Sequence, residues 1–178
     1  AVNPSHYVGA EIPVLGTNAH WAEDGELMVA EGDESDGTLA LYSPEHAVVL
    51  NMEEEHLDFY SGLDHIKEVF NTLLNQTSGQ IIYCKECENS TDVCSVRENS
   101  ISYGWSDADF VASDLRESGG TVAFTVSNRG EVLGRVELGI PGKHNALNAL
   151  AALAVAHESG VPFNDCARAL ATFAGATF

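Results

Sequence analysis

Hydrophobic residues along the chain gather in short runs separated by polar and glycine-containing segments. Three mostly apolar runs of four or five residues occur in the first half, at residues 27–31, 47–50 and 80–84. Continuous apolar runs of this length are typical of strands buried on both faces of a parallel sheet. Residues 64–76 instead place apolar side chains at helical spacing. The last two runs and this helix therefore predict a βαβ unit.

The second half of the chain has a different pattern. Residues 109–114, 121–126 and 132–138 read as strands, and the Asn128-Arg129-Gly130 turn predicts a hairpin with glycine at positive φ. An alanine- and leucine-rich helix is expected over 145–159, closed by Gly160, and a last helix begins at a cap on Asn164 or Asp165. We therefore expect an α/β fold, with a parallel sheet flanked by helices and a small antiparallel sheet. The opening residues, punctuated by Pro and Gly, read as loop.

Charge narrows the classes of partner. The 178 residues suit one domain, and the 44% hydrophobic content is that of a globular protein. Eight Lys and Arg stand against 27 Asp and Glu, which gives a net charge of −19. This field argues against nucleic acid and anionic membrane surfaces as partners. No apolar run reaches membrane-spanning length and no signal peptide is recognisable, so we expect a cytoplasmic protein.

The cysteines form an incomplete metal-binding pattern. Cys84 and Cys87 make a CxxC pair, but Cys94 and Cys166 do not supply a second pair at zinc-ligand spacing. Reduced thiols of a cytosolic protein are the favoured interpretation.

Two polar clusters directly follow predicted strands. The first is EGDESDG at residues 31–37, and the second is NMEEEHLD at residues 51–58. If the two strands are neighbours in a parallel sheet, Glu31 and His56 meet at its carboxyl edge, where ligands bind. Repelling carboxylates there favour a cation, although a solvated acidic loop explains the first cluster equally well. Magnesium prefers oxygen ligands, and manganese would suit a Glu/His pair at least as well.

A third motif, GIPGKHNALNA at residues 139–149, reads as a turn followed by a helix start. Asn145 and Asn148 are three residues apart and share one face of the first turn. An Asn amide offers the donor and acceptor that read an adenine edge. Helix capping by Asn145 with one polar contact from Asn148 is the alternative, and by itself it is the stronger one.

Together these motifs resemble the central domain of the Mur ligases, and most closely the branch that adds alanine. The resemblance covers essentially the whole chain and rests on the stretches NPSHYVGAEI, GTNA, EGDESDGT, NMEEEHLD, YGWSDADF and PGKHNALNALAALAVA. It implies that residues 1–178 form a central-domain fragment with a truncated P-loop-type mononucleotide-binding fold, without the N- and C-terminal domains.

The resemblance also implies a function. Mur ligases are ATP-dependent amide ligases of peptidoglycan synthesis; in the alanine-adding branch the carboxylate of UDP-N-acetylmuramate attacks ATP, and L-alanine then displaces phosphate from the acyl phosphate. Glu31 and His56 match the catalytic ligands of the divalent cation, magnesium or manganese. His144, Asn145 and Asn148 match the motif that receives the adenine end of ATP. Asp33, Glu34 and Ser35 match the same acidic loop without an assigned role.

Departures from the family pattern limit what these residues can do alone. No GxxxxGK[ST] string occurs, and the lysines are only Lys67, Lys85 and Lys143. We therefore expect the isolated fragment to lack ligase activity. Phe70 stands where other branches carry a carbamylated lysine, which favours the alanine-adding branch. Another Mur-type ligase, such as a muropeptide-recycling enzyme, and a non-catalytic nucleotide- or metal-binding scaffold remain as alternatives. The sequence leaves the oligomeric state open.

Overall fold

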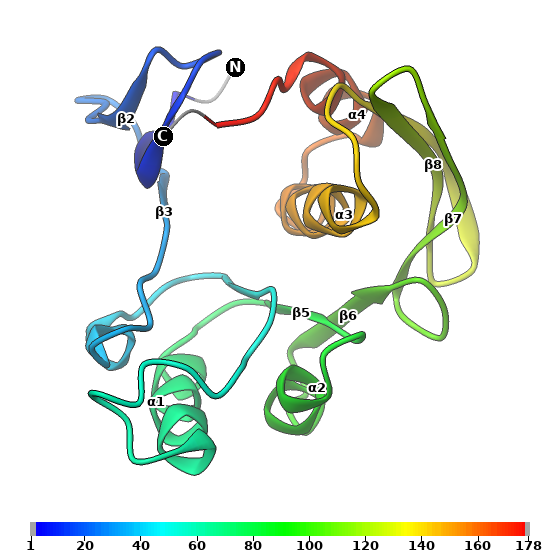
Figure 1. The fold of residues 1–178 in the computed structure, drawn as a ribbon. Coiled ribbons are helices and arrows are strands. Elements are labelled where there is room, and N and C mark those ends of the chain that lie inside the picture. The colour runs from blue at the N-terminus through cyan, green and yellow to red at the C-terminus, as the bar shows by residue number, and fades with distance from the viewer. Residues whose placement is uncertain (1–2, 177–178) are drawn as a thin grey trace.

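A computed structural model describes residues 3–176, which form a larger sheet flanked by helices and a smaller three-stranded sheet (Figure 1). The first sheet has three strands in the order β2-β1-β3, and the second has six in the order β4-β5-β6-β7-β8-β9. The strands of the first sheet are β1 (Ser5–Ile12), β2 (Thr17–His20) and β3 (Met28–Ala30). Those of the second are β4 (Ala47–Val49), β5 (Ile81–Cys84), β6 (Ser100–Gly104), β7 (Phe110–Ser118), β8 (Thr121–Asn128) and β9 (Glu131–Leu138).

Helices cover both faces of the larger sheet. Helices α1 (Leu63–Asn75) and α2 (Glu88–Cys94) lie on one face, and α3 (Lys143–Glu158) and α4 (Phe163–Thr172) lie on the other (Figure 1). The predicted βαβ unit is confirmed, because β4 and β5 pair in parallel and α1 connects them. The α/β class with a parallel sheet flanked by helices is confirmed as well. None of the described helices is both long and apolar enough to cross a membrane.

The apolar run at β5 is continuous because each face of this strand meets a different core. Ile81 and Tyr83 pack with the buried face of α1, where Phe70 and Leu74 lie. Ile82 and Cys84 point the other way and pack with the residues of α3 and the antiparallel strands. Side chains alternate across a strand, so a strand between two helical layers must be apolar at every position. All four β5 residues are buried.

The antiparallel strands continue the main sheet. β7, β8 and β9 pair antiparallel as expected, but β7 also pairs in parallel with β6, so they do not form a sheet of their own. The parallel β6–β7 pairing covers only the residues where β6 ends and β7 begins. Residues 105–109 therefore connect the end of β6 directly to the start of β7, and no helical crossover lies between these two strands. The predicted hairpin turn is confirmed, with φ of 48° at Arg129 and 85° at Gly130.

Several sequence expectations were wrong. The opening segment is not a loop, since β1 and β2 form a hairpin in the smaller sheet. β1 alternates half-buried and exposed positions with small and polar residues, so it lacks an apolar run. Strand β6 and the short polar helix α2 also had no sequence signal. The last helix is capped at Pro162 rather than at Asn164 or Asp165.

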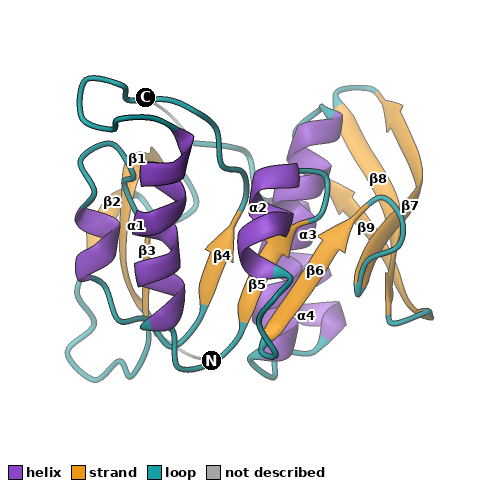
Figure 2. Cartoon of the chain, turned by 90° about the horizontal axis from the view of Figure 1, so that it is seen from below, coloured by secondary structure: helices purple, strands orange, loops and turns teal. Residues whose placement is uncertain are grey.

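Strands β3 and β4 are not neighbours, contrary to expectation. Within residues 3–176, β3 pairs only with β1 and β4 pairs only with β5, so each leaves one edge without a described partner. Figure 2 shows β4, β5 and β6 pointing the same way, with the smaller sheet at the β4 end. A cavity of about 480 Å³ lies between β3 and β4, lined by residues of both strands. Any site shared by the segments after these strands must therefore be assembled by loops.

Candidate metal and nucleotide site

The segments that follow β3 and β4 converge although the strands do not pair. Glu34 lies four positions after the end of β3, and His56 lies seven positions after the end of β4. His56 Nε2 is 3.6 Å from Glu34 Oε1. The carboxyl ends of the two strands therefore face one edge of the molecule, which is where α/β sheets bind ligands.

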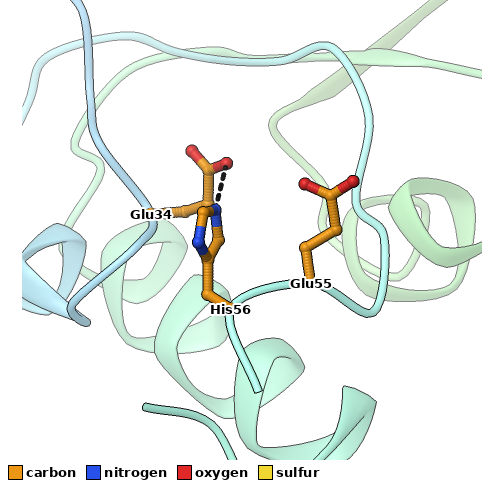
Figure 3. A group of neighbouring side chains, drawn as sticks. All are labelled: Glu34, Glu55 and His56. Carbon is orange, nitrogen blue, oxygen red and sulfur yellow. Dashed lines mark ion pairs between the residues drawn. The ribbon is translucent and has the colours of Figure 1, made fainter. Parts of the chain in front are cut away.

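A group of three potential metal ligands forms at this point. Among the described residues, Glu34, Glu55 and His56 each offer a ligand atom within 4.8 Å of the others. The carboxylate of Glu34 and the imidazole of His56 point toward each other from different loops, and Glu55 stands beside them (Figure 3). These residues also line a cavity of about 190 Å³. Two carboxylates and an imidazole are donors that manganese accepts readily and that magnesium accepts through the oxygens.

Backbone geometry directs the His56 side chain. His56 has φ of 52°, a left-handed conformation that is uncommon for a residue other than glycine. Its carbonyl accepts hydrogen bonds from the N–H groups of Phe59 and Tyr60, both at 2.9 Å. On the other side of the loop, Glu54 Oε1 accepts from Leu63 N at 3.3 Å, at the start of α1. Strained backbone that is held by surrounding contacts is frequent at functional sites.

Hydrogen bonds and nearby charges shift the pKa values of two side chains close to this group. Hydrogen bonds from Ser35 to Asp33, with the backbone N–H at 2.8 Å, lower the pKa of Asp33. The pKa of Tyr60 is raised by burial, and the negative charges of Glu34, Asp36 and Asp33 add to the effect. The tyrosine hydroxyl therefore stays protonated, and it donates a hydrogen bond to the backbone carbonyl of Glu34.

The structure places the predicted ligand Glu31 beside this group and not within it. One Glu31 carboxylate oxygen accepts a hydrogen bond from Gly9 N at 2.5 Å, across the β1–β3 pair. Glu31 and Glu34 both line the larger cavity, and Glu34 also lines the smaller cavity with Glu55 and His56. Sequence reasoning selected Glu31 and His56 and assigned no role to Glu34 or Glu55. Glu34 and Glu55 lie within the two acidic clusters that the sequence singled out. Loop geometry, however, determines which of the acidic side chains points toward His56.

The predicted nucleotide motif begins α3. Lys143 Nζ lies 4.7 Å from the centre of the Trp105 ring, so the start of α3 lies near the carboxyl end of β6. The imidazole of His144 packs on Gly142, where a Cβ would lie 2.7 Å from His144 Cε1. Asn145 Nδ2 donates to Pro141 O at 2.6 Å. Asn148 is exposed, and its side-chain amide makes no hydrogen bond within residues 3–176. Two motif residues thus shape the turn, and the third is available to a ligand.

The cysteines are structural in this arrangement. Cys84, Cys94 and Cys166 are buried free thiols, and burial raises their pKa, to about 12 for Cys94. Cys87 Sγ accepts a hydrogen bond from Met52 N at 3.4 Å. No cysteine belongs to a potential metal group in the part of the chain that the structure describes.

The fold and the site define an α/β domain with an acid–histidine group where its strands end. Residues 8–156 match the Mur ligase middle domain. The chain belongs to this family.

Relatives with assigned names agree with the family. The chain is 42% identical to a UDP-N-acetylmuramate–L-alanine ligase of a Geobacter species, over 98% of the chain and 38% of the relative. It is 45% identical to the enzyme of the same name from Syntrophobacter fumaroxidans, over 88% of the chain and 34% of the relative. The chain thus spans little more than a third of the length of these relatives.

Solved structures share the fold. UDP-N-acetylmuramate–alanine ligase from Thermotoga maritima superposes with a TM-score of 0.86 at 23% identity, over 97% of this chain and 39% of the other. The UDP-N-acetylmuramate:L-alanyl-γ-D-glutamyl-meso-diaminopimelate ligase from Neisseria meningitides gives 0.85 at 24% identity, over 98% and 59%.

Proposed function

We propose that this chain is the middle part of a longer ATP-dependent amide ligase that joins L-alanine to UDP-N-acetylmuramate in the cytoplasm. The relatives at 42% and 45% identity carry the name of that enzyme. The fold does not separate the alanine-adding branch from the branch that attaches a peptide, because the two structures have TM-scores of 0.86 and 0.85. The sequence similarity is what favours L-alanine as the amine substrate.

The observation that carries the proposal is the group of Glu34, Glu55 and His56, with ligand atoms within 4.8 Å of one another. We assign the divalent-cation site to this group together with Glu31, which lines the larger cavity beside Glu34. A cation there supplies positive charge to the phosphate oxygens, which dominates phosphoryl transfer. The chain's own part is to hold these donors in place, as Gly9 N does by donating a hydrogen bond to the Glu31 carboxylate.

The adenine end of ATP is assigned to the start of α3. Helix α3 begins after Gly142, and an exposed Asn amide there offers the donor and the acceptor that pair with an adenine edge. Asn148 presents an unused amide on the exposed face of the first turns. His144 and Asn145 keep the turn in the shape that exposes this amide.

Cation binding is tested directly on the 178-residue chain. We expect Mn²⁺ to bind, as detected by the loss of the free-ion electron paramagnetic resonance signal. Glu34→Gln and His56→Asn are each expected to weaken binding by at least about tenfold, the range seen even for outer-shell partners. Glu117→Gln, at an exposed position of β7, is the matched control and should bind as the wild type does. Equal affinity in all four proteins would refute the cation assignment.

Activity is tested on the complete ligase that carries this domain. We expect phosphate release from ATP that needs both UDP-N-acetylmuramate and L-alanine, and that falls by orders of magnitude in Glu31→Ala and His56→Ala. Release that depends on a muropeptide in place of L-alanine would identify the recycling branch. No release with either amine would support a scaffold. The isolated 178 residues should release none, since they contain no GxxxxGK[ST] loop.

A further inference from the structure

The residues of the proposed cation site follow strands of two different sheets, and no strand pairing fixes their relative position. Glu34 follows β3 in the smaller sheet, and His56 follows β4 in the larger one. No ladder of backbone hydrogen bonds joins β3 to β4. The distance between the two side chains therefore depends on contacts between the loops themselves.

One residue contacts both loops through hydrogen bonds. Tyr60 is 3% exposed, and its hydroxyl donates to the backbone carbonyl of Glu34. Its own backbone N–H donates to the carbonyl of His56 at 2.9 Å. A single rigid side chain thus connects the backbone of one candidate ligand to the backbone of the other. The hydrogen bonds from Ser35 N to Asp33 Oδ1 and from Thr38 N to Asp36 Oδ1 stay within the Glu34 loop and do not reach the His56 loop.

The tyrosine ring is itself held in place. It packs edge-on against Phe59 at 4.9 Å and against His65 at 5.2 Å between ring centres. Phe59 in turn lies on Gly37, where a Cβ would come within 2.9 Å of the ring. The ring packing and the Phe59 contact do not need the hydroxyl, so removing only the oxygen should preserve the fold while releasing Glu34.

From this geometry we propose that Tyr60 is a positioning residue that sets Glu34 relative to His56 and so determines the affinity of the site for a divalent cation. The inference rests on the proposed cation site. If the hydroxyl acts by placing Glu34, its effect on cation binding requires the Glu34 carboxylate. This coupling distinguishes positioning from a general contribution to stability.

The test is a double-mutant cycle on the 178-residue chain, with Mn²⁺ affinity as the readout. The proteins are the wild type, Tyr60→Phe, Glu34→Gln and the double variant, with Tyr42→Phe as the control at a half-exposed tyrosine. We expect Tyr60→Phe to weaken Mn²⁺ binding by about five- to tenfold, the effect of one hydrogen bond. In the Glu34→Gln background the same change should have no further effect, and Tyr42→Phe should bind normally. Circular dichroism melting establishes that each variant is folded at the titration temperature.

The outcomes separate the two proposals. If the wild type binds Mn²⁺, Glu34→Gln weakens binding and Tyr60→Phe does not, the role of Tyr60 is refuted and the cation site stands. If Tyr60→Phe weakens binding equally with and without the Glu34 carboxylate, Tyr60 does not act through Glu34 and the inference is also refuted. If the wild type does not bind Mn²⁺, the cation site is wrong, and the role of Tyr60 fails with it.

Discussion

His56 Nε2 lies 3.6 Å from Glu34 Oε1, although the strands leading to these residues belong to different sheets. Contacts between loops, and the hydroxyl of Tyr60 above all, set this distance. The distance between these two side chains should therefore change more easily than it would if the two strands were paired. Substitutions that shift one sheet against the other should change cation affinity before they unfold the domain.

The packing of α4 on the sheet makes a sharp prediction at Gly134. This residue of β9 has φ of 152°, and a Cβ there would lie 2.5 Å from Cε1 of Phe163 at the start of α4. We expect Gly134→Ala to destabilise the domain by about 1–3 kcal/mol, because the ring must move out of its place. Urea unfolding monitored by circular dichroism measures the change.

Two further variants isolate the steric part of this effect. Gly130→Ala meets no atom within 4 Å but also has positive φ, at 85°, so it reports backbone strain alone. Phe163→Leu in the Gly134→Ala background should recover part of the loss. If Gly134→Ala is no less stable than Gly130→Ala, the Phe163 ring moves without a cost in stability and the steric prediction is wrong.

Asp109 should make the stability depend on pH. Its Oδ2 accepts hydrogen bonds from Ser102 N at 2.9 Å and from Ser102 Oγ at 2.8 Å, and Arg129 lies 3.6 Å from Oδ1. Burial pushes the pKa of Asp109 up, but these hydrogen bonds and the Arg129 charge outweigh it, so the pKa is lowered overall. A lowered pKa means that the carboxylate stabilises the fold above its unfolded-state pKa and that this contribution disappears as the pH falls through the folded-state pKa.

We expect Asp109→Asn to lower the free energy of unfolding at neutral pH by about 1.5 kcal/mol, near the lower end for hydrogen bonds to a charged group. The difference from the wild type should shrink as the pH is lowered toward about 3. Asp24→Asn, at an exposed loop position, is the control. A difference that stays constant across this pH range would contradict the assignment.

Asn148 should matter for nucleotide binding and not for folding. Its amide is exposed and makes no hydrogen bond within the described residues, so Asn148→Ala should leave the melting temperature unchanged. In the complete ligase, the apparent ATP affinity should weaken by about 1–2 kcal/mol for lost hydrogen bonds. Asn164→Ala, at an exposed position of α4, should leave ATP affinity unaltered. Normal ATP affinity in Asn148→Ala would remove the residue from the site.

Much of the larger sheet could be predicted because its signals are local. A strand such as β5, buried on both faces, must be apolar at every position, and the buried face of α1 repeats at helical spacing. The β8–β9 turn needs a residue with positive φ, and Gly130 in the sequence indicates where this turn lies. Strands β1 and β6 mix polar and small residues with few apolar ones. Their hydrogen-bonding partners, rather than their own composition, make them strands.

Periodicity and the order of the motifs were enough to predict the class of fold, the family and the two acidic segments that flank the candidate site. The folded chain alone shows that β3 and β4 stand apart, that Glu34 and Glu55 rather than Glu31 lie against His56, and that Tyr60 joins the two loops. Side chains in irregular loops take directions that depend on contacts distant in sequence, which no local pattern encodes.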